Sequence, residues 1–306
     1  MSAPVMLRSN NTDLFGTSML PVLQELFVDA LAMHPSQREK LFKQVAHDRD
    51  IYQSSELHEL ELFSEIAEGS EYSYKRAKQG ANKTLTIKKM GLGFSISDEM
   101  IADGKFDLVA DMVRMLARSA KESQEVDGMN ILNNGWGSEN TADGLDIFHS
   151  AHTLPSGGTF RNRPSSDADL SEASLQTAIT DFSTIFVGDG GIIKNLQPRY
   201  LVVHPSFKSI AMQLIGSDLQ PDTAENNINT LKNEGLVVVS SPHITDLDSW
   251  FLTASPEQTG LRIVSRRGIE TKSKEVFDND AIKYKASYRE ALGCFHPNGV
   301  YGVQGA

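Results

Sequence analysis

Two histidines and an aspartate are the first candidates for chemistry in this chain. Asp146, His149 and His152 lie three residues apart, and on a helix this spacing would turn a carboxylate and two imidazoles toward one metal ion. Glycine and proline surround them, so a regular helix is not expected, and the chain contains no His-Glu-x-x-His pattern. Two hypotheses stay open: a metal-dependent enzyme using His149 and His152, or histidines that order a loop, which the flanking residues favour.

Two other segments are weaker candidates. Cys294 and His296 have a spacing with no known nucleophile–base geometry, and cysteine is commonly a small buried hydrophobe. Residues 188–191 lack the Gly-Lys-Ser/Thr ending of a phosphate-binding loop, so a turn is expected there. A Gly-x-Ser-x-Gly elbow is also absent from the sequence. We therefore predict that the chain is not an enzyme and needs no cofactor.

Composition excludes several classes of protein. The 306 residues are 40% hydrophobic and 23% charged, which is typical of a soluble globular protein, and no apolar stretch is long enough for a transmembrane helix. A single cysteine rules out an internal disulfide and suits a reducing cytoplasm. With 29 Lys and Arg against 40 Asp and Glu, the net charge is −11. Such a chain repels nucleic acid, which argues against a DNA-binding regulator but is compatible with a container for DNA.

The elements that would position these residues begin with helices in residues 17–50. Pro21 suits a first helical turn, and apolar residues then recur at helical spacing. The pattern breaks at residues 34–36. A second short helix is expected through Leu41, Phe42 and Val45.

A switch in charge follows. Residues 54–71 contain six acids and no Lys or Arg, whereas residues 72–90 contain six bases and no acid. The basic part alternates and Gly80-Ala81-Asn82 offers a turn, so a long two-stranded hairpin is expected. The charges fit a solvated loop, or an arm lying across an oppositely charged surface of another subunit. The second hypothesis assigns an inter-subunit contact to nine residues of this extended loop: Glu65, Glu68, Glu71, Lys75, Arg76, Lys78, Lys83, Lys88 and Lys89.

The rest of the chain predicts an α+β protein. A helix is expected from Phe106 to about Asn133, and at ~1.5 Å per residue it would be roughly 40 Å long, as in a structural spine. Residues 135–168, rich in Gly, Ser, Asn and Pro, are expected to form an irregular connection and a domain boundary. After Leu170, helices alternate with short strands at residues 200–203, 236–239 and 250–252. Strands close the chain at residues 282–289 and 300–303.

Several segments carry a resemblance to a known family through their order and spacing. They are Phe148-His149-Ser150-Ala151-His152, Gly157-Gly158, Asn162, Leu170-Ser171, residues 196–205, residues 236–242, Asp246, Trp250-Phe251-Leu252, residues 280–285, Arg289 and Gly293. Together they resemble the tailed-phage major capsid proteins of the Hong Kong 97 fold, particularly the branch of the phage Mu major head subunit. The resemblance covers about residues 50–303.

The resemblance implies a domain layout. It comprises an N-arm over residues 1–50, an extended loop over 51–95, the first part of a peripheral domain with the spine helix over 96–167, an axial α/β domain over 168–260, and the C-terminal strands of the peripheral domain over 261–306. Some members carry a scaffolding segment of about a hundred residues before the arm. Here only about 50 residues precede the hairpin, and Met1 favours a separate scaffold protein.

The resemblance also implies a function. The chain would self-assemble into pentamers and hexamers of an icosahedral shell, with scaffold and portal proteins as partners. The shell would form in the host cytoplasm and enclose genomic DNA without sequence-specific binding and without a membrane. An encapsulin-like nanocompartment shell protein is the alternative with the same fold, and the metal-dependent enzyme is the alternative from another class.

The charge switch generates a testable prediction. Reversing Lys75, Arg76 and Lys78 to Glu should leave the subunit folded but impair shell assembly, because opposite charges set the register and rate of association. Circular dichroism checks the fold and electron microscopy checks the particles. Normal particles from this variant at low salt would contradict a role for charge pairing.

Overall fold

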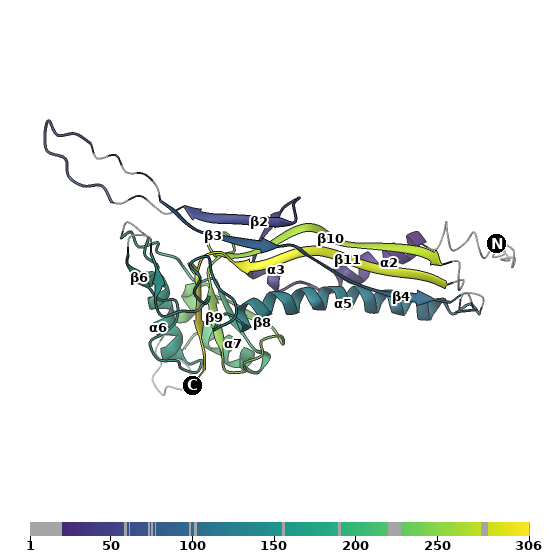
Figure 1. Cartoon of the computed structure of the whole chain (residues 1–306). Coiled ribbons are helices and arrows are strands. Elements are labelled where there is room, and N and C mark those ends of the chain that lie inside the picture. Colours follow the sequence, from purple (N-terminus) through teal and green to yellow (C-terminus); the bar gives the residue numbers. More distant parts are fainter. Residues whose placement is uncertain are drawn as a thin grey trace. The chain divides into compact units, whose positions relative to one another are not determined.

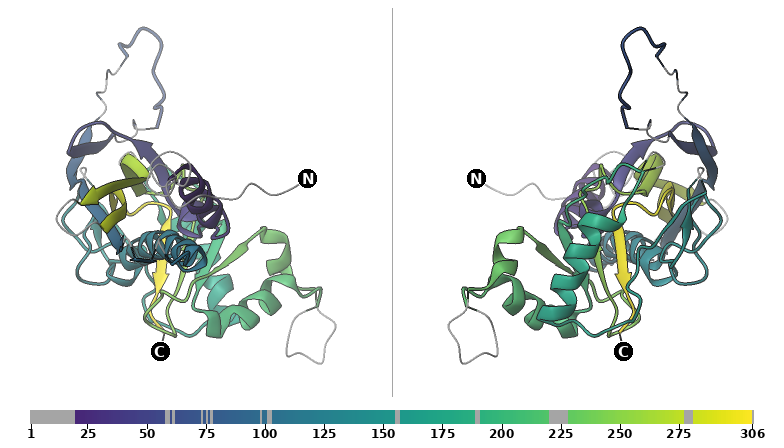
Figure 2. Two further views of the ribbon diagram at one scale, coloured as in Figure 1. Left: turned by 90° about the vertical axis from the view of Figure 1, so that its right-hand side faces the viewer. Right: turned by 90° about the vertical axis from the view of Figure 1, so that its left-hand side faces the viewer.

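The chain forms two compact units (Figures 1 and 2). The computed structural model describes residues 20–57, 60, 62–72, 74, 76, 78–97, 99–100, 103–154, 157–188, 191–219, 228–276 and 281–305. Unit 1 comprises Met1–Ser36, Ile87–Glu125 and Ser265–Glu290, and unit 2 comprises Gln37–Thr86, Val126–Val264 and Ala291–Ala306. Helices and strands are mixed in both units, which confirms the α+β class.

Unit 1 packs two helices against a sheet. Its helices are α2 (Leu20–Ala32) and the first part of α5 (Phe106–Asn133), whose bounds confirm the predicted spine helix. The sheet has the order β1 (Lys43–Ala46), β10 (Leu261–Val276), β11 (Ala281–Cys294) and β4 (Lys88–Ile96). Unit 1 contains β4 and most of β10 and β11, whereas β1 belongs to the residues of unit 2. Alternate residues of β11, such as Tyr284 and Ala286, join Phe27 and Val113 in the core of unit 1. The predicted alternation over residues 282–289 is therefore confirmed.

Unit 2 contains a second four-stranded sheet. Its order is β12 (Val300–Val303), β9 (Trp250–Thr253), β7 (Tyr200–Val203) and β8 (Val237–Ser240); β7 is parallel to β8 and antiparallel to β9. Helices α6 (Glu172–Ile185) and α7 (Lys208–Gly216) and the short turns η3 (Pro205–Phe207) and η4 (Thr230–Glu234) connect the strands. Ser171 caps α6 by accepting a hydrogen bond from the Ser174 amide.

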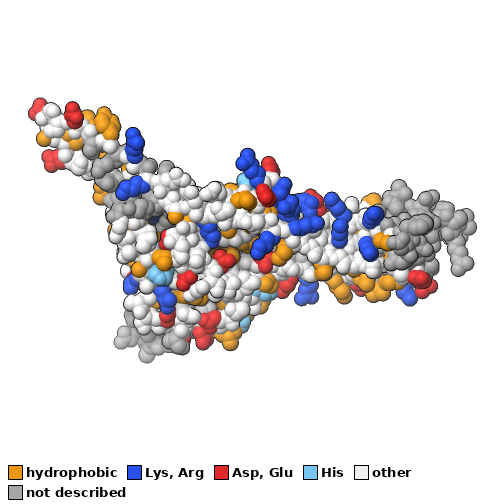
Figure 3. Space-filling view, viewed as in Figure 1, with side chains coloured by type: hydrophobic (Ala, Val, Ile, Leu, Met, Phe, Trp, Pro, Cys, Tyr) orange, Lys and Arg blue, Asp and Glu red, His pale blue; other side chains and the backbone are white. Residues whose placement is uncertain are grey.

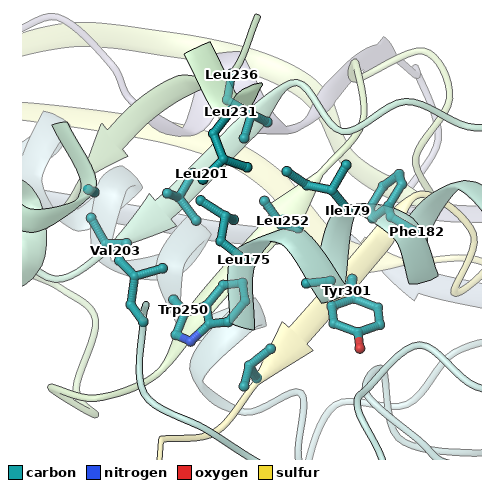
Figure 4. Packing of buried hydrophobic residues seen from close by; sticks show 14 of the residues in the cluster. Leu175, Ile179, Phe182, Leu201, Val203, Leu231, Leu236, Trp250, Leu252 and Tyr301 are labelled. Carbon is teal, nitrogen blue, oxygen red and sulfur yellow. The ribbon is translucent and has the colours of Figure 1, made fainter. Parts of the chain in front are cut away.

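Both faces of this second sheet are buried. Leu201, Trp250 and Leu252 point into a core that includes Leu175 and Phe182 of α6 (Figure 4). Val202, Phe251 and Val300 point the opposite way, into a core with Met129 and Leu132 from the end of α5. Adjacent strand residues face opposite sides of a sheet, which explains why these strands are almost wholly apolar.

One predicted helix is wrong. The structure has a single turn, α3 (Arg38–Leu41), and then strand β1, which contains Val45. Phe42 is already extended, with φ −108° and ψ 136°. Leu41 and Phe42 are both buried in a core of unit 2, and β1 pairs with β10. Strand pairing therefore overrides the helical spacing of these three residues.

The hairpin exists, but its turn is elsewhere. Strands β2 (Ile51–Leu57) and β3 (Gln79–Thr86) pair antiparallel, and Gly80-Ala81-Asn82 lies inside β3. The pairing jumps from Ser55↔Asn82 to Leu57↔Gln79, so β3 has one extra residue there, a bulge that glycine accommodates. The predicted turn at residues 80–82 is therefore wrong.

The glycine-rich connection lies inside unit 2. It includes the small strands β5 (His152–Thr153) and β6 (Thr159–Phe160). Ile147 and Phe148 are buried in the core that contains Met129. Across the residues that the structure describes, no helix has the length and apolar character needed to cross a membrane.

Phe148 generates a stability prediction. A Cβ at Gly302 would lie 2.6 Å from the Phe148 ring, and one at Gly135 would lie 2.7 Å from it. Gly302→Ala should therefore lower the free energy of unfolding by about 1–3 kcal/mol, because the buried ring has no room to shift. Denaturant unfolding measures the change. Gly268→Ala, where the added Cβ meets nothing within 4 Å, is the control, and equal effects of the two changes would contradict this account.

Candidate functional site

His152 orders the glycine-rich connection. Its ring is fully buried; Nδ1 donates to Asp143 Oδ2 at 2.7 Å, and Nε2 lies 3.2 Å from both the Ile147 carbonyl and Asn162 Oδ1. Both ring nitrogens thus face oxygen atoms. His149 receives a hydrogen bond from the Ala151 amide at its own Nδ1. The two rings are held by separate partners and do not converge on a shared ligand.

Asp143 is the charged partner in this network. Burial alone would raise its pKa, but hydrogen bonds from His152 and Thr141 and the charge of His152 lower the pKa below its usual value. Within the described residues, no group of three His, Cys, Asp or Glu side chains is placed to hold a metal ion. This geometry favours the loop-ordering hypothesis over the metal-dependent enzyme.

The other chemical candidates are structural as well. Cys294 ends β11, is fully buried and donates to the His296 carbonyl at 3.1 Å. Burial raises the pKa of its thiol to about 12, so the thiol is not a nucleophile at neutral pH. Among residues 188–191, the Gly191 amide donates to the Gly188 carbonyl, as in a turn.

The described residues of the extended loop of unit 2, between β2 and β3, are exposed. Between β2 and β3 the chain continues outward from the two strands (Figures 1 and 2), and every described residue from 60 to 78 is exposed. The chain reverses at a turn in which the Ser70 amide donates to the Ala67 carbonyl at 3.0 Å. Gly69 adopts φ +81° there, a backbone conformation that favours glycine. The acidic half thus forms the end of the loop.

Apolar and aromatic side chains at this end are candidate contact residues that the pattern of charged residues did not identify. Phe63 is completely exposed and Tyr74 is 93% exposed. Four further apolar or aromatic residues of the loop are exposed: Leu60, Leu62, Ile66 and Tyr72. Figure 3 shows hydrophobic side chains next to acidic ones at the end of the loop. Their clustering between residues 60 and 74 was the signal in the sequence that could have identified them.

The eight predicted contact residues that the structure describes separate into three groups, and the ninth, Lys75, is not described. Glu65, Glu68, Glu71, Arg76 and Lys78 lie on the exposed loop. Lys83 lies on β3, where its ammonium group contacts the Asn140 carbonyl and lies 3.8 Å from the Glu139 carboxylate. Lys88 and Lys89 lie on β4 of unit 1 and not on the loop between β2 and β3. Their role in contacts between subunits stays a prediction.

Comparison with known proteins identifies the family. The family model described as phage capsid protein matches residues 81–303, more than half of the chain. The chain belongs to the phage capsid protein family. It is therefore a structural protein that forms the shell of the virion. No curated protein matches this capsid protein.

Solved capsids share its fold. A virus-like particle from Pyrococcus furiosus has a TM-score of 0.60 at 10% identity, covering 94% of this chain and 100% of that chain. The capsid of the cyanophage P-SCSP1u has a TM-score of 0.56 at 13% identity, covering 88% and 87%. The procapsid of bacteriophage JBD30 has a TM-score of 0.54 at 13% identity, covering 95% and 75%. The Hong Kong 97-type fold is therefore confirmed, whereas the narrower resemblance to phage Mu stays a prediction.

The buried network of Asp143 generates a pH prediction. Because the folded-state pKa of Asp143 is lowered, its contribution to stability is present above its unfolded pKa of about 4 and is lost as pH falls through the folded-state value. Asp143→Asn should lower the free energy of unfolding of the subunit at pH 7 by about 3 kcal/mol, since a buried pair loses one partner.

Denaturant unfolding at pH 7 and at pH 3 tests this account. The difference in the free energy of unfolding between the variant and the original protein should shrink as pH falls from 7 to 3, because below about pH 4 the unfolded chain binds a proton at Asp143 more readily than the folded chain does. Asp146→Asn, a change in the same connection with no described hydrogen bond to the carboxylate, is the matched control. A difference that stays the same at both pH values would contradict the assignment.

Proposed function

We propose that this capsid protein is the major head subunit of a tailed phage and that it assembles through its extended loop. The observation that carries the proposal is the exposed apolar end of the loop in a member of a shell-forming family. A single chain gains nothing by exposing Phe63 and Tyr74, whereas a contact between copies removes them from water. Heterologous contacts of this kind close into rings, here pentamers and hexamers.

The proposed layout assigns a task to each part. The segment over residues 168–260 packs around five-fold and six-fold axes, while the spine helix and the strands of unit 1 form the peripheral region between capsomers. The loop ties each subunit to its neighbour. Because each subunit makes several such contacts, weak individual contacts are sufficient for a stable shell.

The remaining partners are also part of this proposal. Separate scaffold and portal proteins direct assembly in the host cytoplasm, and the shell then encloses genomic DNA. The net charge of −11 supports enclosure without tight binding to the genome. The buried thiol of Cys294 and the engaged ring of His152 support a protein without catalytic activity.

Electron microscopy tests the proposed function. The protein is expressed alone and together with its neighbouring genes, and the particles are imaged. Closed icosahedral shells that contain DNA in the presence of the other phage proteins are expected. Open or irregular aggregates under all conditions would contradict a head subunit, and shells that package an enzyme and never DNA would point to a nanocompartment.

Phe63 generates a sharper prediction. Phe63→Ser should leave the free energy of unfolding within about 0.5 kcal/mol, because the side chain is exposed in the single chain. It should raise the protein concentration needed for half-maximal assembly by about 10-fold or more, since burying a phenylalanine stabilises a contact by about 1.5–3 kcal/mol. Light scattering against protein concentration measures this.

Phe63→Tyr is the matched control, because it keeps the aromatic ring. It should assemble at nearly the original concentration. Assembly of Phe63→Ser at the same concentration as the original protein would exclude the apolar end of the loop from the contact.

A further inference from the structure

An open groove lies between the two helices of unit 1. Its walls include Leu26, Asp29 and Met33 from α2 and its C-terminal end, and Arg114, Met115 and Arg118 from α5. The residues on each helix recur at intervals of three or four positions, which places them on one helical face. The groove has a volume of about 420 Å³, so it has room for a few side chains of a peptide segment.

Two methionines make this groove apolar and leave it exposed to water. Met33 is 77% exposed and Met115 is 68% exposed, whereas Ala30 between the helices is buried. In Figure 3, hydrophobic side chains are exposed along the lower edge of this unit, where Figure 1 places α5. Methionine is unbranched and flexible, so such a surface can adapt to the apolar side chains of a bound segment.

The charges of the groove favour an occupant that carries both signs. Arg114 donates to Asp111 at 2.7 Å, which forms an ion pair within α5. Asp29 and Arg118 are exposed, and neither forms an ion pair with another residue that the structure describes. The groove thus offers one carboxylate and one guanidinium group to a partner with the complementary charges.

The chain itself supplies a segment with this chemistry. Residues 1–19 lie outside the described residues and directly precede α2. They contain one base, Arg8, which follows Val5-Met6-Leu7, and one acid, Asp13, which precedes Leu14-Phe15. The segment therefore carries the apolar groups and both charges that the groove can bind.

The segment is long enough to reach the groove of its own chain. The twelve residues between Leu7 and the start of α2 can span up to about 40 Å when extended. Met33, just after the end of α2, lies about 20 Å from the start of that helix, at ~1.5 Å per residue. Asn10-Asn11 and Gly16 are residues at which a chain reverses easily. Because segment and groove belong to one chain, their effective concentration exceeds that of a separate copy.

We propose that the N-terminal segment of the free subunit folds back and binds in the groove between α2 and α5 of its own chain. The apolar residues beside Arg8 and Asp13 cover the two methionines. Arg8 faces Asp29 of α2, and Asp13 faces Arg118 of α5. The segment thereby shields an apolar surface that would promote irregular association of free subunits. This inference goes beyond the proposed function and does not depend on it, since it concerns the single chain.

Disulfide formation in the free subunit tests where the segment binds. On mild oxidation at low protein concentration, Leu7→Cys/Met33→Cys should give a monomer with an internal disulfide, identified by mass spectrometry. Leu7→Cys/Lys272→Cys is the matched control. Lys272 is exposed on β10, and it lies on the sheet face opposite to Ile269, which packs against the core with the helices. The control should form its disulfide at least about tenfold more slowly. The buried Cys294 should stay unlinked in both.

A charge swap tests the pairing. In the Leu7→Cys/Met33→Cys protein, Arg118→Glu should slow formation of the disulfide about two- to fivefold, as expected for an exposed ion pair, and Asp13→Lys should do the same. Combining the two changes should restore the original rate, because opposite charges face one another again. Lys272→Glu should leave the rate unchanged. Circular dichroism verifies that each variant is folded.

The outcomes distinguish the possible occupants of the groove. Disulfides that link separate chains even at low concentration would assign the groove to the segment of a neighbouring copy and overturn the contact within one chain. Equal rates for the Met33→Cys and Lys272→Cys proteins would show that the segment does not bind there and would overturn the inference outright. Neither result affects the proposed function, which the formation of shells tests separately.

Discussion

The exposure of Phe63 and the other described apolar side chains at the end of the extended loop is the constraint on which the proposed assembly depends. The turn at Ala67 to Ser70 directs these residues away from β2 and β3, and no described residue between 60 and 78 is covered. Under the proposed function, the free energy of removing them from water is gained on assembly. The folded subunit therefore leaves apolar side chains of the loop exposed to water.

The rest of the structure gives this loop a rigid base. The sheet of unit 2 is buried on both faces, and Lys83 on β3 is joined to residues 139–140 of the glycine-rich connection. That connection is in turn fixed by the buried hydrogen bonds of Asp143, His152 and Asn162. The polar network that first suggested chemistry thus supports the surface from which the loop projects. A firmly held base reduces the entropy lost when the loop binds a neighbour.

Much of the fold could be predicted because its signals are local. Helix α5 could be predicted from the spacing of its own apolar residues, and the start of α6 from the Ser171 cap. Strands β7 and β9 could be predicted because nearly all of their own residues are apolar. The errors lie where distant pairing decides: Val45 is in a strand because β10 adjoins it, and Gly80 is in a strand because β2 lies opposite. The charge switch identified a loop that the structure shows to be exposed. However, its emphasis on charged residues overlooked the exposed Phe63, because exposure cannot be inferred from residue type.

Protection of the loop on assembly is the most direct test of this account. A Glu-specific protease should cut the free subunit rapidly at Glu65, Glu68 and Glu71, because all three are exposed. In purified shells the same sites should be cut at least about tenfold more slowly, while Glu257, exposed elsewhere on unit 2, serves as the reference site. Equal cleavage of the loop in free subunits and in shells would contradict its role as the contact between copies.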